Sequence, residues 1–444
     1  MLWAALAVGS VLSCIVTYRF ATMSLVLGSE AGNWVYIYLQ GFHIRSIEVF
    51  LRVAVVCGVL CAIPLRVARR YEWPVVFLWL LVGFALQGQL RSLAPYSVEQ
   101  VFVSDGSNSF YTPTQHYEPR TLLADFDRHR LALPTHAQSN MPGKLMLVFA
   151  LEQVSNQPAV LAWLVVALSN LGGILLYLFA RDLFADRTAA IVALIFYLFV
   201  PAKVFFFPVL NTVTPVVALL FAYLWLRWLR TARAPYAILL GVTFYGLLFY
   251  EPMPLVLGLL FGAFTAQALW RAEIGWRTLL VQVGLAAMAF AATYVTVLAW
   301  FGFNLFATLS RVSADAVAFN AAHRPYAVWV WRNLVDFLFG VGVCQAVIFC
   351  VLVGYCLHRA YTRREAEPIV VFCLSSAALL LATDLLGVNR GEVVRLWIFL
   401  ACFLQIPAAF VCARLHSRVA VMLVLGTTLL QDALGTAMFN FAQP

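Results

Sequence analysis

The sequence predicts an all-α integral membrane protein with about 13 transmembrane helices. Of its 444 residues, 63% are hydrophobic and only 11% are charged, whereas a soluble domain carries about 25% charged residues. Apolar stretches long enough to cross about 30 Å of hydrocarbon recur along the chain. Each is expected to be a helix, because lipid offers no hydrogen-bonding partner to a peptide backbone.

The predicted spans divide the chain into three parts. Helices within residues 1–91 come first, one long polar loop at 92–157 follows, and residues 158–444 form the main bundle with short outward loops. The first span has no basic n-region and no clear cleavage site, so we interpret it as a helix and not as a signal peptide. In chain order the spans are 2–18, 47–65, 73–91, 158–179, 188–202, 208–227, 236–250, 253–270, 278–302, 337–357, 368–385, 392–413 and 418–436.

Basic residues in the short connections predict which side of the membrane each loop faces. The positive-inside rule places the arginine-rich connections in the cytoplasm, so residues 19–46, 92–157 and 303–336 face outward. The net charge of +9 mostly reflects this bias and gives little support to nucleic-acid binding. The arginines concerned are Arg66, Arg69, Arg70, Arg181, Arg187, Arg227, Arg230, Arg233, Arg271, Arg277, Arg359, Arg363, Arg364, Arg414 and Arg418.

Several kinds of site have no signature in the sequence. All nine cysteines fall within predicted spans, so the outward loops hold no disulfide framework, and no CxxC spacing indicates a metal site. Neither a Walker A motif nor a dinucleotide-binding glycine fingerprint is present. The polar side chains of the outward loops are therefore the main candidates for chemistry.

The loop 92–157 is by far the longest interruption of the hydrophobic pattern, and such loops are usually functional or disordered. Its aromatic residues favour an ordered loop that packs on the membrane face. Apolar spacing predicts a short amphipathic surface helix over Pro119–Leu131. A second helix is predicted from Pro142 to Glu152, with the proline in its first turn.

Two stretches of the chain carry a family resemblance. Asp105 stands near the start of the outward loop, surface helices follow, and His136 precedes a Pro142-Gly143-Lys144 stretch that leads back into the membrane. Residues 389–397, Asn-Arg-Gly-Glu-Val-Val-Arg-Leu-Trp, are similar to an element of bacterial multi-pass glycosyltransferase-like proteins. Together these features resemble the GT-C superfamily of polyprenyl-phosphate-sugar glycosyltransferases.

The resemblance implies a glycosyltransferase of the cell envelope. Such an enzyme moves a hexosyl or pentosyl group from a polyprenyl-phosphate donor to a glycan or lipid acceptor on the outer face of the membrane. The expected location is the bacterial cytoplasmic (inner) membrane, with membrane lipids as further partners and no nucleic acid.

The sequence departs from the superfamily at two places. In the best-known members the acidic residue follows the first helix, whereas Asp105 follows the third predicted one. Many members also carry an aspartate in a later Phe-Pro-x-x-Asp element, where this chain has Asn211. The second departure leaves the use of a divalent metal open, and no metal ligand is predicted.

Sugar transfer needs a base for the acceptor proton and positive charge for the departing phosphate. We predict Asp105 as the base, because small flexible residues flank it at the membrane surface. The competing interpretation is that Asp105 forms an Asx turn. Asp125 and Asp127 are the alternative bases; two residues apart on a predicted helix, they do not share a face.

The donor phosphate is predicted to contact Lys144, His136, Asn140 and Arg120. Lys144 follows a Pro-Gly pair, where glycine permits close backbone approach and the free N–H groups of the next helix favour an anion. It is also one of only two lysines in the chain. The competing interpretation is a lysine whose charged end merely reaches the membrane interface.

Glu392 and Arg395 lie three residues apart at the outward mouth of a predicted helix, so they share one face. Ionisable residues at this depth are costly unless they are paired or functional. A structural ion pair is one interpretation; the other is that Arg395 binds substrate phosphate, whose oxygens suit a guanidinium. Trp329 and Trp331, in the outward stretch 303–336, are expected to belong to an interfacial aromatic belt, and stacking against the acceptor or the sugar is the alternative.

A transporter or flippase of lipid-linked sugars is the alternative function, since carriers have a similar number of helices. Carriers place ionisable residues at the bilayer midplane, on helices broken by glycine or proline, and often show two related halves. The sequence shows neither related halves nor a cluster of charges within the spans, and its polar residues gather in one outward loop. The enzyme is therefore the favoured prediction.

Overall fold

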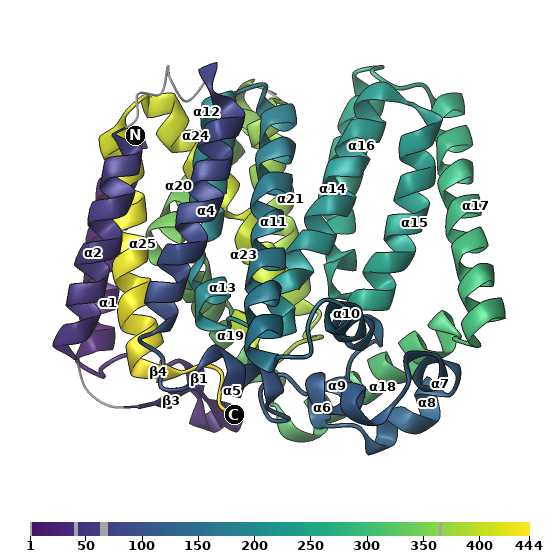
Figure 1. Cartoon of the computed structure of the whole chain (residues 1–444). Coiled ribbons are helices and arrows are strands. Elements are labelled where there is room, and N and C mark those ends of the chain that lie inside the picture. The colour runs from purple at the N-terminus through teal and green to yellow at the C-terminus, as the bar shows by residue number, and fades with distance from the viewer. Residues whose placement is uncertain (1, 40–42, 63–69, 364–365) are drawn as a thin grey trace.

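The computed structural model describes residues 2–39, 43–62, 70–363 and 366–444. In this part of the chain, long helices run in a common direction and short helices cover one end of the bundle (Figure 1). Eleven described helices are long and apolar enough to cross a membrane, and Ala234–Tyr250 is a shorter apolar helix. The protein is thus an all-α multi-pass membrane protein, as predicted.

The long elements of the bundle coincide with the predicted spans. In chain order they are α1 (Leu2–Ala21), α2 (Ile44–Cys61), α4 (Glu72–Arg91), α11 (Pro158–Phe184), α12 (Arg187–Leu198) with α13 (Pro201–Phe205), η3 (Leu210–Val213) with α14 (Thr214–Thr231), α15 (Ala234–Tyr250), η4 (Met253–Leu257) with α16 (Gly258–Trp270), α17 (Trp276–Phe301), α20 (Val343–Arg363), α21 (Pro368–Leu385), α23 (Ile398–Phe403) with α24 (Gln405–Leu415), and α25 (Arg418–Met438).

Three spans differ from the prediction in detail. The span predicted at 337–357 starts later, at Val343, because Gly342 has a φ of +104° and ends the preceding helix. The span predicted at 392–413 is broken into α22 (Val393–Leu396), α23 and α24. The span predicted at 47–65 runs into residues 63–69, which lie outside the described residues.

Short helices form a layer at the predicted outward end (Figure 1). The surface helix predicted over Pro119–Leu131 is interrupted at Asp125, whose φ of −119° and ψ of 35° are not helical. The second predicted helix is present and begins at Gly143. The elements of the loop 92–157 are α5 (Val98–Val103), α6 (Tyr111–His116), α7 (Pro119–Ala124), α8 (Phe126–His129), η2 (Arg130–Ala132), α9 (Thr135–Gln138) and α10 (Gly143–Glu152).

The outward stretch 303–336 is mostly helical, which the sequence reading did not predict. Helix α18 (Leu305–His323) lies along the outward surface beside the short helices, and α19 (Tyr326–Val341) follows it (Figure 1). Trp329, on α19, is fully buried and donates from Nε1 to the Gly32 carbonyl at 3.1 Å, so its assignment to an interfacial belt is wrong. Trp331 is 74% exposed, as a belt residue would be.

Arginines predicted to face the cytoplasm gather at the opposite end of the bundle, where they tie the connections together. Arg181 and Arg187 both pair with Glu72, at 2.8 and 3.0 Å, across three helices. Arg418 donates to the Ala62 carbonyl at 2.8 Å. Arg66, Arg69 and Arg364 lie outside the described residues.

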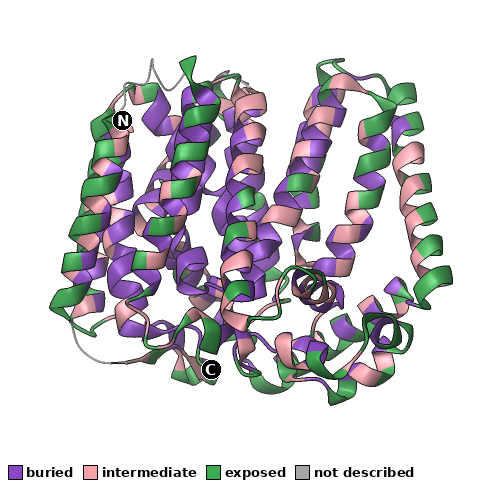
Figure 2. Ribbon diagram, viewed as in Figure 1, coloured by how far each residue is buried: buried purple, intermediate pink, exposed green. Residues whose placement is uncertain are grey.

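The spans differ widely in how much of their length is buried inside the bundle. The most apolar window of Arg187–Phe205 is entirely buried, whereas none of the corresponding window of α17 is. Figure 2 shows the same contrast, with buried residues along α12 and mostly partly buried or exposed ones along α17, where Leu279 and Gln282 are the buried residues. The site described below lies at the predicted outward end, where the short helices lie (Figure 1).

A segment near the start of the chain is fastened to this end. Strand β1 (Gly28–Ser29) pairs with β2 (Trp34–Val35), and β3 (Ile37–Tyr38) pairs with β4 (Phe439–Asn440), both antiparallel. The Gly28 N–H donates to both carboxylate oxygens of Asp336 on α19, at 3.2 and 3.1 Å. These contacts hold residues 27–38 against α19 and the residues after α25.

Candidate functional site

Four charged or polar side chains from distant parts of the chain form a connected group at the predicted outward end, which we call the Arg395 cluster: His136, Arg324, Glu392 and Arg395. Arg395 Nη1 lies 2.9 Å from His136 Nε2, and Arg395 Nη2 donates to one carboxylate oxygen of Glu392. Arg324 donates to the other oxygen. One carboxylate is therefore shared by two guanidinium groups.

His136 is a neutral member of the cluster. The positive charge of Arg395, followed by burial, lowers the pKa of His136 to about 3. Its ring also hydrogen-bonds the backbone of Gly106. With no proton on Nε2, the imidazole accepts from Arg395 and fixes one edge of the guanidinium.

The backbone of residues 389–397 explains why Glu392 can reach two arginines. Gly391 has a φ of +77° and Glu392 a φ of +56°, so the chain turns sharply just before α22. The positive φ of Gly391 favours glycine, and a Cβ there would also lie 2.3 Å from Arg324 Nη1, so the guanidinium that holds Glu392 would have to shift. Asn333 clamps this turn by accepting from the Gly391 N–H at 2.9 Å and donating to the Asn389 carbonyl at 2.9 Å.

Lys144 is held in a second, closed arrangement, the Lys144 pair. Its Nζ lies 2.9 Å from Glu251 Oε2 and donates to Asn140 Oδ1 at 3.0 Å, and the side chain is wholly buried. Thr214 Oγ1 donates to the same Glu251 oxygen at 2.5 Å. Burial lowers the pKa of Lys144 while Glu251 opposes that shift.

Gly143 is required for this pairing. A Cβ there would lie 2.5 Å from the Phe249 carbonyl oxygen and 2.6 Å from Tyr250 Cα, so only glycine lets α10 approach the end of α15 so closely. The glycine identified in the sequence therefore serves helix packing in this structure. It brings Lys144 to Glu251 and away from solvent.

The Arg395 cluster and the Lys144 pair adjoin. Asn140 donates to the His136 carbonyl at 2.7 Å and accepts from Lys144, so it links the two. The charge of Arg395 is also felt at Lys144, whose pKa it lowers. Three cations, Arg324, Arg395 and Lys144, thus face two carboxylates, which leaves one excess positive charge.

Asp105 is joined to the Arg395 cluster through the backbone of the next residue. It is exposed, and it immediately precedes Gly106, whose backbone bonds the His136 ring. The side chain that caps this turn is Ser104, whose Oγ accepts from the N–H groups of Gly106 and Ser107, both at 3.1 Å. The Asx-turn interpretation therefore does not explain the aspartate.

Asp125 and Asp127 line a separate cavity of about 350 Å³ between α7, α8 and the start of α18. Asp127 pairs with Arg311 at 2.8 Å, and Asp125 is exposed. The cavity shares no lining residue with the Arg395 cluster. Arg120 is exposed and also lies outside the cluster and the Lys144 pair, so the structure does not bring it together with the other predicted phosphate ligands.

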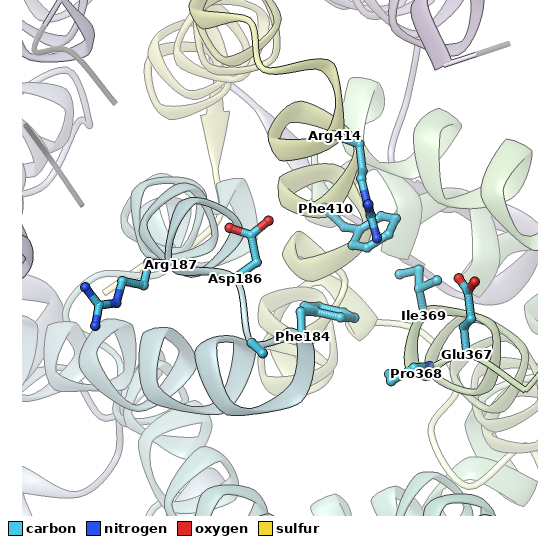
Figure 3. A pocket seen from close by; sticks show the side chains of 9 residues that line it. Phe184, Asp186, Arg187, Glu367, Pro368, Ile369, Phe410 and Arg414 are labelled. Atoms are coloured by element: carbon cyan, nitrogen blue, oxygen red, sulfur yellow. The ribbon is translucent and has the colours of Figure 1, made fainter. Parts of the chain in front are cut away.

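A larger cavity, of about 540 Å³, lies at the predicted cytoplasmic end between α12, α21 and α24. In Figure 3, Asp186 and Arg414 point into it, while Arg187 turns away. None of the predicted site residues lines this cavity.

Sequence reasoning missed two contributors to the Arg395 cluster. The sequence assigns no role to Arg324, which lies in the stretch 303–336. Its ion pair with Glu392 joins distant parts of the chain. Asn333 was likewise given no role. Sequence spacing holds no sign of either contact. Within the described residues, no group of three or more His, Cys, Asp and Glu side chains could hold a metal ion.

Comparisons with known proteins found similar folds only among solved structures. No family model and no curated protein sequence matches the chain. Three structures of an oligosaccharyltransferase from Archaeoglobus fulgidus, a GT-C enzyme, align with 81–84% of this chain at 13–15% identity and TM-scores of 0.41–0.44. One is an apo form, one a complex with zinc and sulfate, and one a complex of that enzyme with an inhibitory peptide and a dolichol-phosphate.

The aligned region covers 53–56% of the archaeal enzyme, so this chain spans about half its length. These neighbours belong to the superfamily that the sequence resembles. At such TM-scores, any function for this chain has to be argued from its own residues.

Proposed function

We propose that this protein is a membrane glycosyltransferase that moves a sugar from a polyprenyl-phosphate donor to a glycan or lipid acceptor on the outer face of the membrane. The observation that carries the proposal is the Arg395 cluster, in which two arginines share one carboxylate and His136 bonds the backbone of Gly106, the residue after Asp105. The cluster lies near the start of α22, and the proposal places the lipid-linked phosphate at this end of the bundle.

The Arg395 cluster has donor capacity left for an anion. Arg395 Nε–H is buried and has no hydrogen-bond partner among the described residues. An unpaired buried donor costs about 1–3 kcal/mol, and a phosphate oxygen would remove that cost with a charge-assisted bond. His136 and Glu392 hold the guanidinium in a fixed orientation, which reduces the entropy lost on binding.

The proposed reaction uses Asp105 as a general base. Its carboxylate takes the proton from an acceptor hydroxyl, and the hydroxyl oxygen forms a bond to the anomeric carbon of the donor sugar. The bond from that carbon to the phosphate oxygen breaks, and its electron pair leaves with the polyprenyl phosphate. Arg395 stabilises the negative charge on the leaving phosphate.

A transporter or flippase of lipid-linked sugars remains the second candidate, and one observation favours it. Lys203 and Asp432 are wholly buried within spans, and both oxygens of Asp432 have no hydrogen-bond partner among the described residues. Ionisable groups inside a membrane bundle often mark a translocation path. Lys203 is held by Asn170 at 3.0 Å and lies over the Tyr197 ring, so a structural role accounts for it.

The two functions are separated by following the donor in proteoliposomes. The purified protein would be given a panel of polyprenyl-phosphate hexoses and pentoses together with glycan and lipid acceptors, and the release of polyprenyl phosphate would be measured. We expect release, and we expect it to fall about 100-fold or more in Asp105→Asn but not in Asp125→Asn. Movement of intact donor between leaflets without release would show a flippase and contradict the proposal.

A further inference from the structure

Tyr36 is the residue between strands β2 and β3, and it is held firmly by its neighbours. Its side chain is only 5% exposed. Its ring packs against Trp34 with centroids 4.2 Å apart and against Phe441 at 5.0 Å. Its N–H donates to the Leu27 carbonyl at 3.1 Å. The ring therefore has little freedom to move.

The Tyr36 hydroxyl is buried and has no hydrogen-bond partner among the described residues. Leaving a buried hydroxyl unpaired costs about 1–3 kcal/mol, and most buried polar side chains in proteins do find a partner. Phenylalanine would fill the same space without that cost. The hydroxyl therefore indicates a partner outside the described chain.

The surroundings of Tyr36 connect it to the Arg395 cluster. Arg324 lies over the neighbouring Trp34 ring, 5.4 Å from its centroid, and also holds Glu392. Burial and the negative charges of Asp336 and Glu392 raise the pKa of Tyr36 well above its usual value, against the opposing effect of Arg395 and Arg324. The hydroxyl keeps its proton at physiological pH and can act as a donor.

Two unpaired buried donors thus lie along one run of contacts, the Tyr36 hydroxyl and Arg395 Nε. The Tyr36 ring packs on Trp34, Arg324 lies over Trp34, and Arg324 and Arg395 both hold Glu392. Neither has a protein acceptor in the described residues. A ligand with several acceptor oxygens and negative charge would satisfy both at once, and a phosphate group has these properties. Neutral ligands would pair the hydroxyl and leave the guanidinium charge uncompensated.

We propose that the Tyr36 hydroxyl and Arg395 Nε–H together donate to the phosphate of the lipid-linked sugar, which makes residues 27–38 one wall of the donor site. This inference rests on the proposed function. It assigns to Tyr36 a binding role that the sequence did not indicate, and it gives the β1–β3 segment a reason to be fastened over this end of the bundle. A lipid phosphate and a free phosphate both present the phosphate oxygens that these two donors would bind, so the test has to distinguish them.

The test is a binding titration on the full-length protein in detergent micelles, with farnesyl phosphate and inorganic phosphate as separate probes. Tyr36→Phe removes one oxygen and leaves the packing intact. We expect it to raise the Kd for farnesyl phosphate about tenfold or more, which is the loss of one hydrogen bond to a charged group. Tyr245→Phe is the matched control, because its hydroxyl is also buried and unpaired among the described residues but belongs to the bundle at α15.

The outcomes separate this inference from the proposed function. If the wild type does not bind farnesyl phosphate, or if Arg395→Gln binds it equally well, the phosphate site itself fails and the inference with it. If Arg395→Gln weakens binding but Tyr36→Phe does not, only the role of Tyr36 is overturned. Equal weakening in Tyr36→Phe and Tyr245→Phe also overturns it, since the effect would then be general. Equal affinity for inorganic phosphate and farnesyl phosphate overturns the assignment to a lipid.

Discussion

The Lys144 pair and the Arg395 cluster are neighbours that solve the same physical problem in opposite ways. Both place cations and carboxylates at the outward end of a membrane bundle. Lys144 is wholly buried, and Glu251 and Asn140 lie within 3.0 Å of its Nζ. The Arg395 side chain is 12% exposed and its Glu392 partner 22% exposed, and one guanidinium N–H has no partner among the described residues.

The difference separates a structural charge from a functional one. A buried ion pair whose cation already contacts a carboxylate and an amide oxygen holds helices in register and is closed to solvent. A partly open cluster with excess positive charge and a free donor is poised to bind an anion. We therefore infer that Lys144 supports the fold at α10 and α15, while Arg395 provides the positive charge that the proposed reaction needs.

The largest expected effect is on stability, from breaking the Lys144 pair. Lys144→Met leaves Glu251 as a buried charge without its partner, which costs about 3–5 kcal/mol. Thermal unfolding in detergent would measure the loss. The double variant Lys144→Met with Glu251→Leu should recover most of it. If Lys144→Met were as stable as the wild type and no longer bound the polyprenyl-phosphate donor, Lys144 would be a phosphate ligand. The contrast between a structural and a functional charge would then be wrong.

Arg395→Gln should have the opposite profile. Glu392 keeps its contact with Arg324, so we expect the unfolding temperature to change little. Transfer activity should fall about 10²–10³-fold, as when a donor to the transition-state charge is removed from an active site. Arg311→Gln is the control, because Arg311 is also an outward arginine paired with a carboxylate, Asp127. A similar fall in both variants would point to the loss of general surface charge.

A smaller effect is expected from His136 through pH. Because the pKa of His136 in the folded protein is about 3, the unfolded chain takes up a proton near pH 6.5 that the folded protein does not. The stability that this group contributes is thus present above pH 6.5 and is lost as pH falls toward 3. Between pH 7 and pH 5 the loss is about 2 kcal/mol.

The control for this prediction is a variant that keeps an acceptor for Arg395 without titrating. His136→Gln should flatten the dependence of the unfolding temperature on pH, whereas His116→Gln, at an exposed position, should leave it unchanged. An unaltered pH profile in His136→Gln would mean that another group titrates, and that His136 does not lie neutral against Arg395.

The sequence could predict the bundle but not the pairing of its charges. Hydropathy is a local property, so the apolar spans were found with small errors at glycine breaks such as Gly342. Lys144 lies on a predicted helix beside a glycine, which resembles an anion site, yet its partner Glu251 comes from a distant turn. Lys144 is buried by residues that are distant in the sequence, and a local sequence pattern cannot indicate which residues these are.

The candidate site could be predicted in part for the same reason. The local pattern of residues 389–397 is enough to indicate Glu392 and Arg395 as site residues. The structure places Arg395 in direct contact with His136, another predicted site residue. The second arginine on Glu392, Arg324, lies far away in sequence. Glu392 and Arg395 are therefore not an isolated ion pair. In a variant with the two charges exchanged, the arginine at position 392 would face Arg324. The role of Asp105 stays a prediction, supported by its place beside Gly106.

The most direct test of the comparison is a structure of the protein with farnesyl phosphate bound. The account predicts phosphate density within hydrogen-bonding distance of Arg395, at the outward end, with the contact between Lys144 and Glu251 still closed. Density against Lys144 Nζ with that contact opened would contradict it. So would a phosphate seated at the opposite end of the bundle, in the cavity lined by Asp186 and Arg414.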